Sequence, residues 1–261
     1  MRVPILSMAC MAVAMAFAFA APILLLFHYK RKGAQVLPFF VGCGVFVLFV
    51  AAEGAVNNLL FVRLPLGEKL RASAPLYALA GGLMAGLFEE TGRFAAFRTV
   101  LNKRLGNDRN ALMYGAGHGG VEAMLLLGLA YLSNLIMAAM LNVGLGDKLT
   151  AGLTGTAAEQ VQAALTNLAT AAPWTYLLGM LERAVAMTTH ICLSVLVWFA
   201  AKKPGKGWLF PLAILLHAIL DGLTVILAAR LPVVAVEGCL VVIAAVLAGI
   251  ACIVWKRNAE V

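Results

Sequence analysis

The chain has 261 residues, of which 63% are hydrophobic and 12% charged, and it carries a net charge of +8. A soluble domain has about twice that charged fraction, so the composition excludes a water-soluble fold. We expect one all-α domain, residues 1–261, folded as a polytopic transmembrane helix bundle in the lipid bilayer. The basic residues stand in short clusters between apolar runs. This placement indicates control of membrane topology and argues against nucleic-acid binding.

The first apolar run follows Arg2 and imitates a signal peptide. It continues through Leu26 and Phe27 and ends at a basic cluster that begins with Lys30. A translocated segment would not carry such a cluster directly after its apolar run, so we interpret the run as the first transmembrane helix.

Seven segments have the roughly 20 apolar residues that a transmembrane helix needs. They are residues 3–27, 36–61, 74–98, 111–141, 173–201, 207–229 and 232–255. The loop between the fourth and fifth spans predicts a short helix outside the bilayer core, at about residues 157–168. Lys and Arg are in excess in the loops after spans one, three and five, which predicts an external N-terminus and a cytoplasmic C-terminus. We expect an integral protein of a bacterial-type cytoplasmic membrane.

Ionisable residues recur inside the predicted spans, where each costs about 2.5–3.5 kcal/mol on insertion scales. They are Glu53, Glu89, Glu90, Arg93, His118, Glu122, Glu182, Arg183, His190, His217 and Asp221. Structural ion pairing explains one or two such residues, and we assign Glu182 and Arg183 to a pair of this kind. A rise of about 1.5 Å per residue places Glu89 and the three histidines of the set at one depth, on four helices. This coincidence predicts a shared site.

Spacing along the helices agrees with a shared site. Three pairs stand four residues apart and therefore share a helix face: Glu89 with Arg93, His118 with Glu122, and His217 with Asp221. Glu89 and Glu90 point about 100° apart, so one of them enters the site, and the sequence leaves open which.

The residue types suit peptide hydrolysis. A buried glutamate beside a histidine activates water, and we assign this role to Glu89, with His118 and Glu122 in support. His217 with Asp221 is assigned to the carbonyl oxygen. Glu90 remains the alternative base, and three residues take supporting positions: Arg93, His190 and Glu53. A metal-free site is favoured, with zinc as the alternative, held by Glu89, His118 and His217.

Other intramembrane protease signatures are weak in this chain. There is no HExxH motif and no GxSxG motif around its four serines. A GxGD sequence ends at Asp147, but it falls in a loop, and the other aspartates are Asp108 and Asp221. The sequence therefore disfavours zinc enzymes of the HExxH type, rhomboid-type serine proteases and presenilin-like aspartyl proteases.

Three motifs in order resemble those of the CAAX-protease and bacteriocin-processing (Abi) superfamily. They are Glu89-Glu90-Thr91-Gly92-Arg93, Tyr114 to His118, and His217 to Asp221. Residues Gly117 to Glu122 are similar to the Gly-His-Gly-Gly-x-Glu segment of its YhfC-like branch. The resemblance spans about residues 85–225 and implies a glutamic-type intramembrane protease, once described as a metalloprotease, with Glu89 as general base. Its substrate would be a membrane-embedded or lipidated peptide.

Two departures from the superfamily pattern bear on individual residues. Arg93 lies one residue closer to the glutamates than in EExxxR, which leaves open which glutamate it pairs with. Asp221 replaces the commoner Asn, so it either holds a proton or orients His217.

Two other functions fit a buried cluster of Glu and His. A proton-coupled transporter would use the cluster as a proton relay, although the chain has no clear internal repeat. A non-catalytic membrane scaffold of the same fold is the second alternative, and the presence of all the key residues argues against it.

Overall fold

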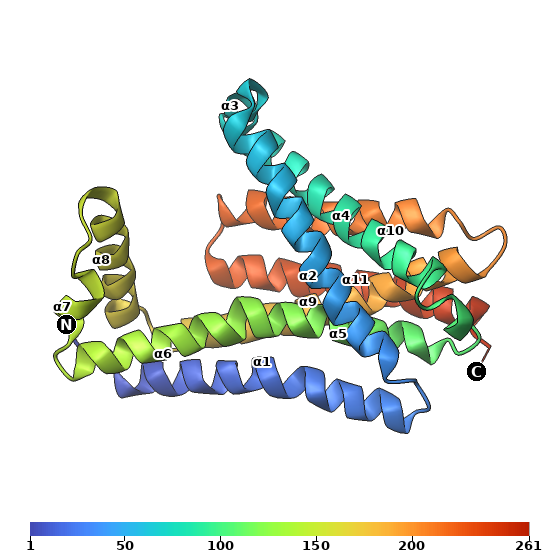
Figure 1. Cartoon of the computed structure of the whole chain (residues 1–261), viewed down its shortest axis with the longest axis horizontal. Coiled ribbons are helices and arrows are strands. Elements are labelled where there is room, and N and C mark those ends of the chain that lie inside the picture. The colour runs from blue at the N-terminus through green and yellow to red at the C-terminus, as the bar shows by residue number, and fades with distance from the viewer. Residues whose placement is uncertain (261) are drawn as a thin grey trace. The chain divides into compact units, whose positions relative to one another are not determined.

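The structure is a computed structural model that describes residues 1–260, and every regular element in that range is helical (Figure 1). The predicted all-α class is therefore confirmed. In chain order the elements are α1 (Ile5–Arg31), α2 (Leu37–Asn57), η1 (Asn58–Arg63), α3 (Pro65–Arg71), α4 (Ala74–Arg98), η2 (Asn102–Arg104), α5 (Arg109–Ala123), η3 (Met124–Gly128), α6 (Leu129–Asn142), α7 (Gly146–Thr150), α8 (Gly155–Thr170), α9 (Thr175–Lys202), α10 (Leu209–Ala228) and α11 (Val233–Asn258).

Six helical stretches within residues 1–260 are long and apolar enough to cross a membrane. They are Ile5–Arg31, Leu37–Arg63, Arg109–Asn142, Thr175–Lys202, Leu209–Ala228 and Val233–Asn258. The third predicted span, residues 74–98, also folds as a helix, the 25-residue α4, but Glu89, Glu90 and Arg93 make it more polar than these six stretches. The predicted loop helix is present as α8.

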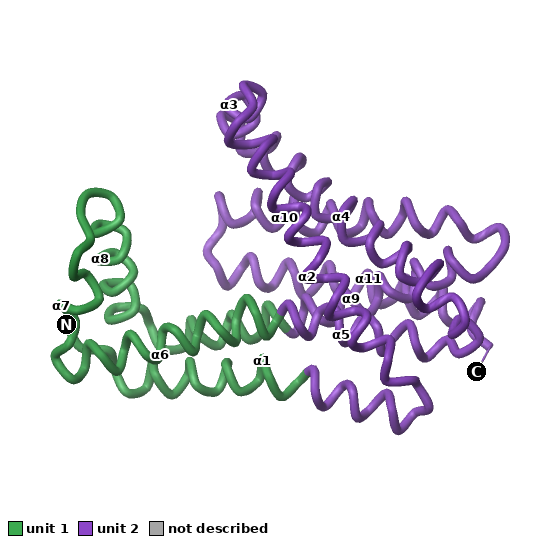
Figure 2. Tube along the Cα trace, viewed as in Figure 1, with its two compact units in different colours: residues 1–21, 123–183 green, residues 22–122, 184–261 purple. Residues whose placement is uncertain are grey.

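The chain divides into two compact units, shown in Figure 2. Unit 1 comprises residues 1–21 and 123–183, and unit 2 comprises residues 22–122 and 184–261. The expectation of a single domain stays a prediction.

In unit 2, α4 lies along α10, with glycines at the contact. A Cβ at Gly82 would lie 2.5 Å from the backbone oxygen of Ala218, and one at Gly86 would lie 2.6 Å from that of Ile214. Small residues let the backbones of membrane helices approach closely. This approach brings the Glu89–Glu90 segment of α4 beside His217 of α10.

An aromatic cluster in unit 2 packs α4 against α5 and α9. Phe97 of α4 has its ring centroid 4.7 Å from that of Tyr114 of α5 and 5.0 Å from that of Trp198 of α9, and all three side chains are fully buried. Edge-on aromatic pairs of this kind stabilise a core beyond their buried area. The cluster therefore fixes α4, α5 and α9 relative to one another close to the polar residues.

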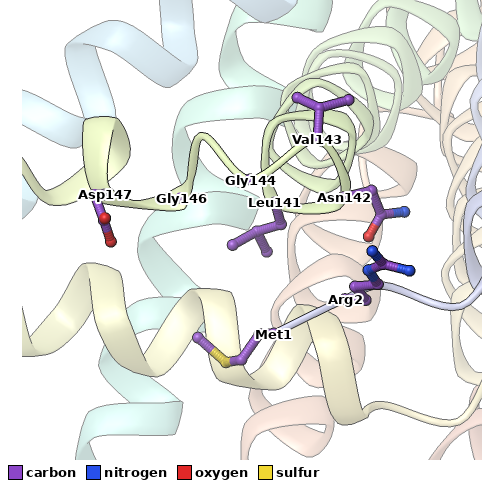
Figure 3. A pocket seen from close by; sticks show the side chains of 8 residues that line it. All are labelled: Met1, Arg2, Leu141, Asn142, Val143, Gly144, Gly146 and Asp147. Atoms are coloured by element: carbon purple, nitrogen blue, oxygen red, sulfur yellow. The ribbon is translucent and has the colours of Figure 1, made fainter.

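Unit 1 contains a hollow of about 470 Å³ at the end of α6 (Figure 3). The Asn142 amide ties the N-terminal segment there, accepting a hydrogen bond from the Val3 nitrogen (2.8 Å) and donating one to the Val3 oxygen (3.0 Å). Asp147 of the GxGD sequence lines this hollow at the opposite end from Arg2 (Figure 3). No second aspartate lines the hollow, so its geometry gives no support to an aspartyl protease site.

Candidate active site

Four helices of unit 2 bring eight of the predicted site residues into one cluster, and all of them except Asp221 are buried. The cluster consists of Glu89, Glu90 and Arg93 from α4, His118 and Glu122 from α5, His190 from α9, and His217 and Asp221 from α10. The ninth predicted residue, Glu53 of α2, accepts its side-chain hydrogen bond from Asn57, one turn along the same helix (3.0 Å).

Glycines let α5 lie against its neighbours at the level of the site. A Cβ at Gly117 would lie 2.0 Å from the backbone oxygen of Phe39, and one at Gly115 would lie 2.5 Å from the Cα of Ile191. The close approach of α5 to α9 places the rings of His118 and His190 with their centroids 4.6 Å apart. A larger residue at Gly115 would push α5 away from α9 and so separate the two histidines.

Glu89 and His118 form a buried pair between α4 and α5. Glu89 Oε2 lies 2.8 Å from His118 Nε2, and the residues are 7% and 0% exposed. The ring of Phe46 packs edge-on against His118, with centroids 5.2 Å apart. His118 Nδ1 is buried without a hydrogen-bond partner among the described residues. The pair thus combines a carboxylate, a fixed imidazole and an uncommitted ring nitrogen.

Glu90 bonds in a different direction from Glu89. Its Oε2 accepts a hydrogen bond from Arg93 Nη1 at 2.5 Å, and its Oε1 lies 2.8 Å from His217 Nδ1. Glu90 and Arg93 are both fully buried. The glutamate that pairs with Arg93, which the sequence left open, is therefore Glu90.

His190 lies at the centre of the cluster. Arg93 Nη2 lies 3.0 Å from its Nδ1, and Glu122 Oε2 lies 2.7 Å from its Nε2. A guanidinium only donates hydrogen bonds, so Nδ1 accepts from Arg93 and the ring proton sits on Nε2, facing Glu122. The sequence placed His190 in a supporting position, whereas the structure makes it the link between α4, α5 and α9.

The cluster is most open at Asp221. Its side chain is 37% exposed, and Oδ2 lies 3.5 Å from His217 Nε2. The other predicted site residues of α4, α5, α9 and α10 are 9% exposed or less. The open side of the cluster is therefore the side of His217 and Asp221.

Three donor atoms converge within the cluster in a way that suits a metal ion. One ligand atom each from Glu89, His118 and His190 lies within 4.8 Å of the other two. Two histidines and one glutamate make up the protein ligands of a common class of catalytic zinc site. The donor set fits a metal, and its third member is His190, where the sequence analysis named His217. His217 instead binds Glu90.

Comparison with known proteins identifies the family of the chain. The sequence model of a family described as YhfC intramembrane metalloprotease matches residues 17–244. This chain belongs to the YhfC family. The protein named "Uncharacterized membrane protein YhfC" of Bacillus subtilis (strain 168) is 33% identical over 213 residues, which is 81% of each chain. No solved structure matches the chain. The family description supports a membrane protease, while the wider CAAX and Abi relationship stays a prediction.

Two buried acidic residues were not singled out by the sequence analysis. Glu237 lies inside α11 and is 6% exposed. It falls within a predicted apolar span, so the depth argument that selected the other acidic residues applies to it as well. Asp108, in the loop before α5, is 2% exposed and accepts hydrogen bonds from Trp198 Nε1 and Lys202 Nζ, both at 2.8 Å. Only the fold shows that this loop end is buried against α9.

Proposed function

We propose that this protein is an intramembrane endopeptidase that hydrolyses a peptide bond of a membrane-embedded or lipidated substrate. The observation that carries the proposal is the buried contact between Glu89 Oε2 and His118 Nε2, 2.8 Å long, on two facing helices. A carboxylate held by an imidazole in a site shielded from bulk water is suited to remove a proton from a water molecule.

In this mechanism Glu89 takes one proton from a water molecule, and the water oxygen bonds to the carbonyl carbon of the substrate. The proton then passes to the amide nitrogen as the carbon–nitrogen bond breaks, which leaves a carboxylic acid and an amine. His118 holds Glu89 in the required orientation through Nε2. Glu89 ends the cycle as the carboxylate with which it began.

His217 and Asp221 serve the carbonyl oxygen. His217 Nδ1 faces Glu90, which leaves Nε2 directed toward Asp221 and the open side of the cluster. A proton on Nε2, favoured by the Asp221 carboxylate 3.5 Å away, would be available to the oxygen that gains negative charge during attack. Hydrogen-bond donors placed there stabilise the oxyanion.

Arg93 positions the reacting groups without contacting the substrate. It bridges Glu90 and His190 and so ties α4 to α9. Because Glu90 is engaged by Arg93 and His217, we assign the base to Glu89 and a positioning role to Glu90.

A metal ion, implied by the family description, would be held by Glu89, His118 and His190. A zinc ion there would supply a Lewis acid that polarises water or the carbonyl group. His190 Nδ1 lies 3.9 Å from Glu89 Oε2 and accepts a hydrogen bond from Arg93, so an ion held at this nitrogen would replace that hydrogen bond.

The test uses the purified full chain in proteoliposomes with single-span transmembrane peptides, and the products are identified by mass spectrometry. We expect cleavage by the native protein and a loss of about 10²–10⁴-fold in Glu89→Gln, which is typical for removal of a general base. Glu68→Gln, an exposed site on α3, is the matched control and should retain full activity. Equal cleavage by both variants would refute the assignment of Glu89.

The same vesicles separate the other functions. Solute flux driven by a pH gradient, without peptide cleavage, would replace the protease proposal with a transporter. Absence of both activities would favour a scaffold.

A further inference from the structure

A groove of about 190 Å³ lies where α10 begins and α11 ends, at one end of both spans. Its lining comes from the loop before α10, the start of α10 and the last turns of α11, and none of the lining residues is acidic. These residues are Lys206, Trp208, Leu209, Ile250, Ile253, Val254, Arg257 and Asn258. The groove shares no residue with the active-site cluster.

The groove has an apolar part and a basic part. Ile250 and Ile253 line it along α11, and Ile253 is 54% exposed. Lys206 and Arg257 line it at the helix ends, and Trp208 beside them is 56% exposed. Tryptophan and basic residues at the end of a membrane span are typical of the headgroup region. The order from basic to apolar thus follows a phospholipid from its phosphate to its acyl chains.

We propose that this groove binds one anionic phospholipid, with its phosphate at Lys206 and Arg257 and an acyl chain along Ile250 and Ile253. The argument is charge complementarity, because ammonium and guanidinium groups donate strong hydrogen bonds to phosphate oxygens. A zwitterionic lipid would leave the positive charge of the groove uncompensated. An apolar helix from another protein would cover the isoleucines but leave both cations unpaired.

The neighbouring acidic residues do not cancel this positive charge. Glu260, two residues beyond the groove, forms ion pairs with Lys203 at 3.1 Å and Lys202 at 3.7 Å. The hydrogen bond from Lys203 lowers the pKa of Glu260, which keeps this carboxylate ionised and paired. Asp108 is engaged by Lys202. Lys206 and Arg257 remain available to an external anion.

The experiment is native mass spectrometry of the detergent-solubilised full chain with phosphatidylglycerol or phosphatidylcholine of identical acyl chains. Near an anionic surface each Lys or Arg contributes on the order of fivefold to binding. We therefore expect the double variant Lys206→Gln/Arg257→Gln to lose about 25-fold in phosphatidylglycerol affinity. The control Lys30→Gln/Lys32→Gln removes the same charge from the exposed end of α1 and the turn after it, and it should leave this affinity unchanged. Circular dichroism confirms that both variants are folded.

Each other outcome contradicts the proposal. An equal loss of phosphatidylglycerol affinity in both double variants would show that the overall charge of the protein, and not the groove, attracts the lipid. Equal binding of phosphatidylcholine by the native chain would remove the anionic headgroup from the proposal. Displacement of phosphatidylglycerol by millimolar inorganic phosphate would make a free anion the ligand. A dimer that persists without lipid and is lost in the groove variant would make a second copy of the chain the occupant.

Discussion

Glu89 and Glu90 are neighbours on α4, and their carboxylates bond to different helices. Glu89 lies 2.8 Å from His118 of α5, whereas Glu90 lies 2.8 Å from His217 of α10 and also binds Arg93. Successive residues on a helix point about 100° apart, so two adjacent carboxylates can serve two functions. One is free to act on water, and the other holds α4, α9 and α10 together through its partners.

The Glu90–Arg93 pair predicts a large and coupled effect on stability. Removing one partner of a buried ion pair costs about 3–5 kcal/mol, because it leaves a buried charge uncompensated. Glu90→Gln and Arg93→Met should each lower the free energy of unfolding in mixed micelles by that amount, and the double variant by less than the sum. Lys203→Met, at an exposed pair with Glu260, should leave the free energy of unfolding nearly unchanged. Additive effects in the double variant would show that the two residues do not interact.

The metal ligands predict a difference between two histidines of the cluster. Zinc bound by the purified protein, measured by elemental analysis and titration, should fall at least 100-fold in affinity in His190→Ala. His217→Ala should retain zinc within about 10–100-fold, the usual effect of a residue outside the ligand set. The reason is that His190 and not His217 shares the convergent donor group with Glu89 and His118. A larger loss of zinc affinity in His217→Ala than in His190→Ala would contradict this ligand set. Absence of zinc binding by the native chain would favour the metal-free mechanism with Glu89 as base.

The contact of α4 with α10 predicts opposite effects at two adjacent glycines. Gly82→Ala places a methyl group 2.5 Å from the Ala218 oxygen and should cost about 1–3 kcal/mol of unfolding free energy. Gly81→Ala meets no atom within 4 Å and should gain about 0.5–1 kcal/mol, because alanine loses less entropy in a helix. The free energies of unfolding of the two variants are measured in mixed micelles and compared with that of the native protein. Equal stability of the two variants would mean that α4 does not approach α10 this closely.

Much of this arrangement could be predicted from the sequence. Apolar runs predicted the helices, and the spacing of charged residues predicted that Glu89, His118 and His217 would lie in one cluster. Both inferences depend on distances along a helix, which the sequence contains. One predicted span, α4, is not among the six stretches that are apolar enough to cross a membrane, because its charged residues make it less apolar.

The partners within the cluster could not be predicted in the same way. They depend on the rotation of each helix about its axis, which is set by contacts such as that of Gly117 with Phe39. For this reason the pairing of Arg93 with Glu90 and the central place of His190 emerged only from the structure. The sequence likewise does not predict the two π-helical segments, η1 and η3, which shift the helical register locally. Neither contains a proline, and the only glycine in them is Gly128 at the end of η3.

The most direct test of the site compares the turnover of Glu89→Gln and Glu90→Gln with their stability, using one membrane peptide substrate. We predict that Glu89→Gln stays folded with near-native stability and loses about 10²–10⁴-fold in turnover. Glu90→Gln should lose stability, and its remaining folded fraction should turn over faster than Glu89→Gln. Near-native turnover in Glu89→Gln together with loss of turnover in a stably folded Glu90→Gln would contradict the assignment and make Glu90 the base.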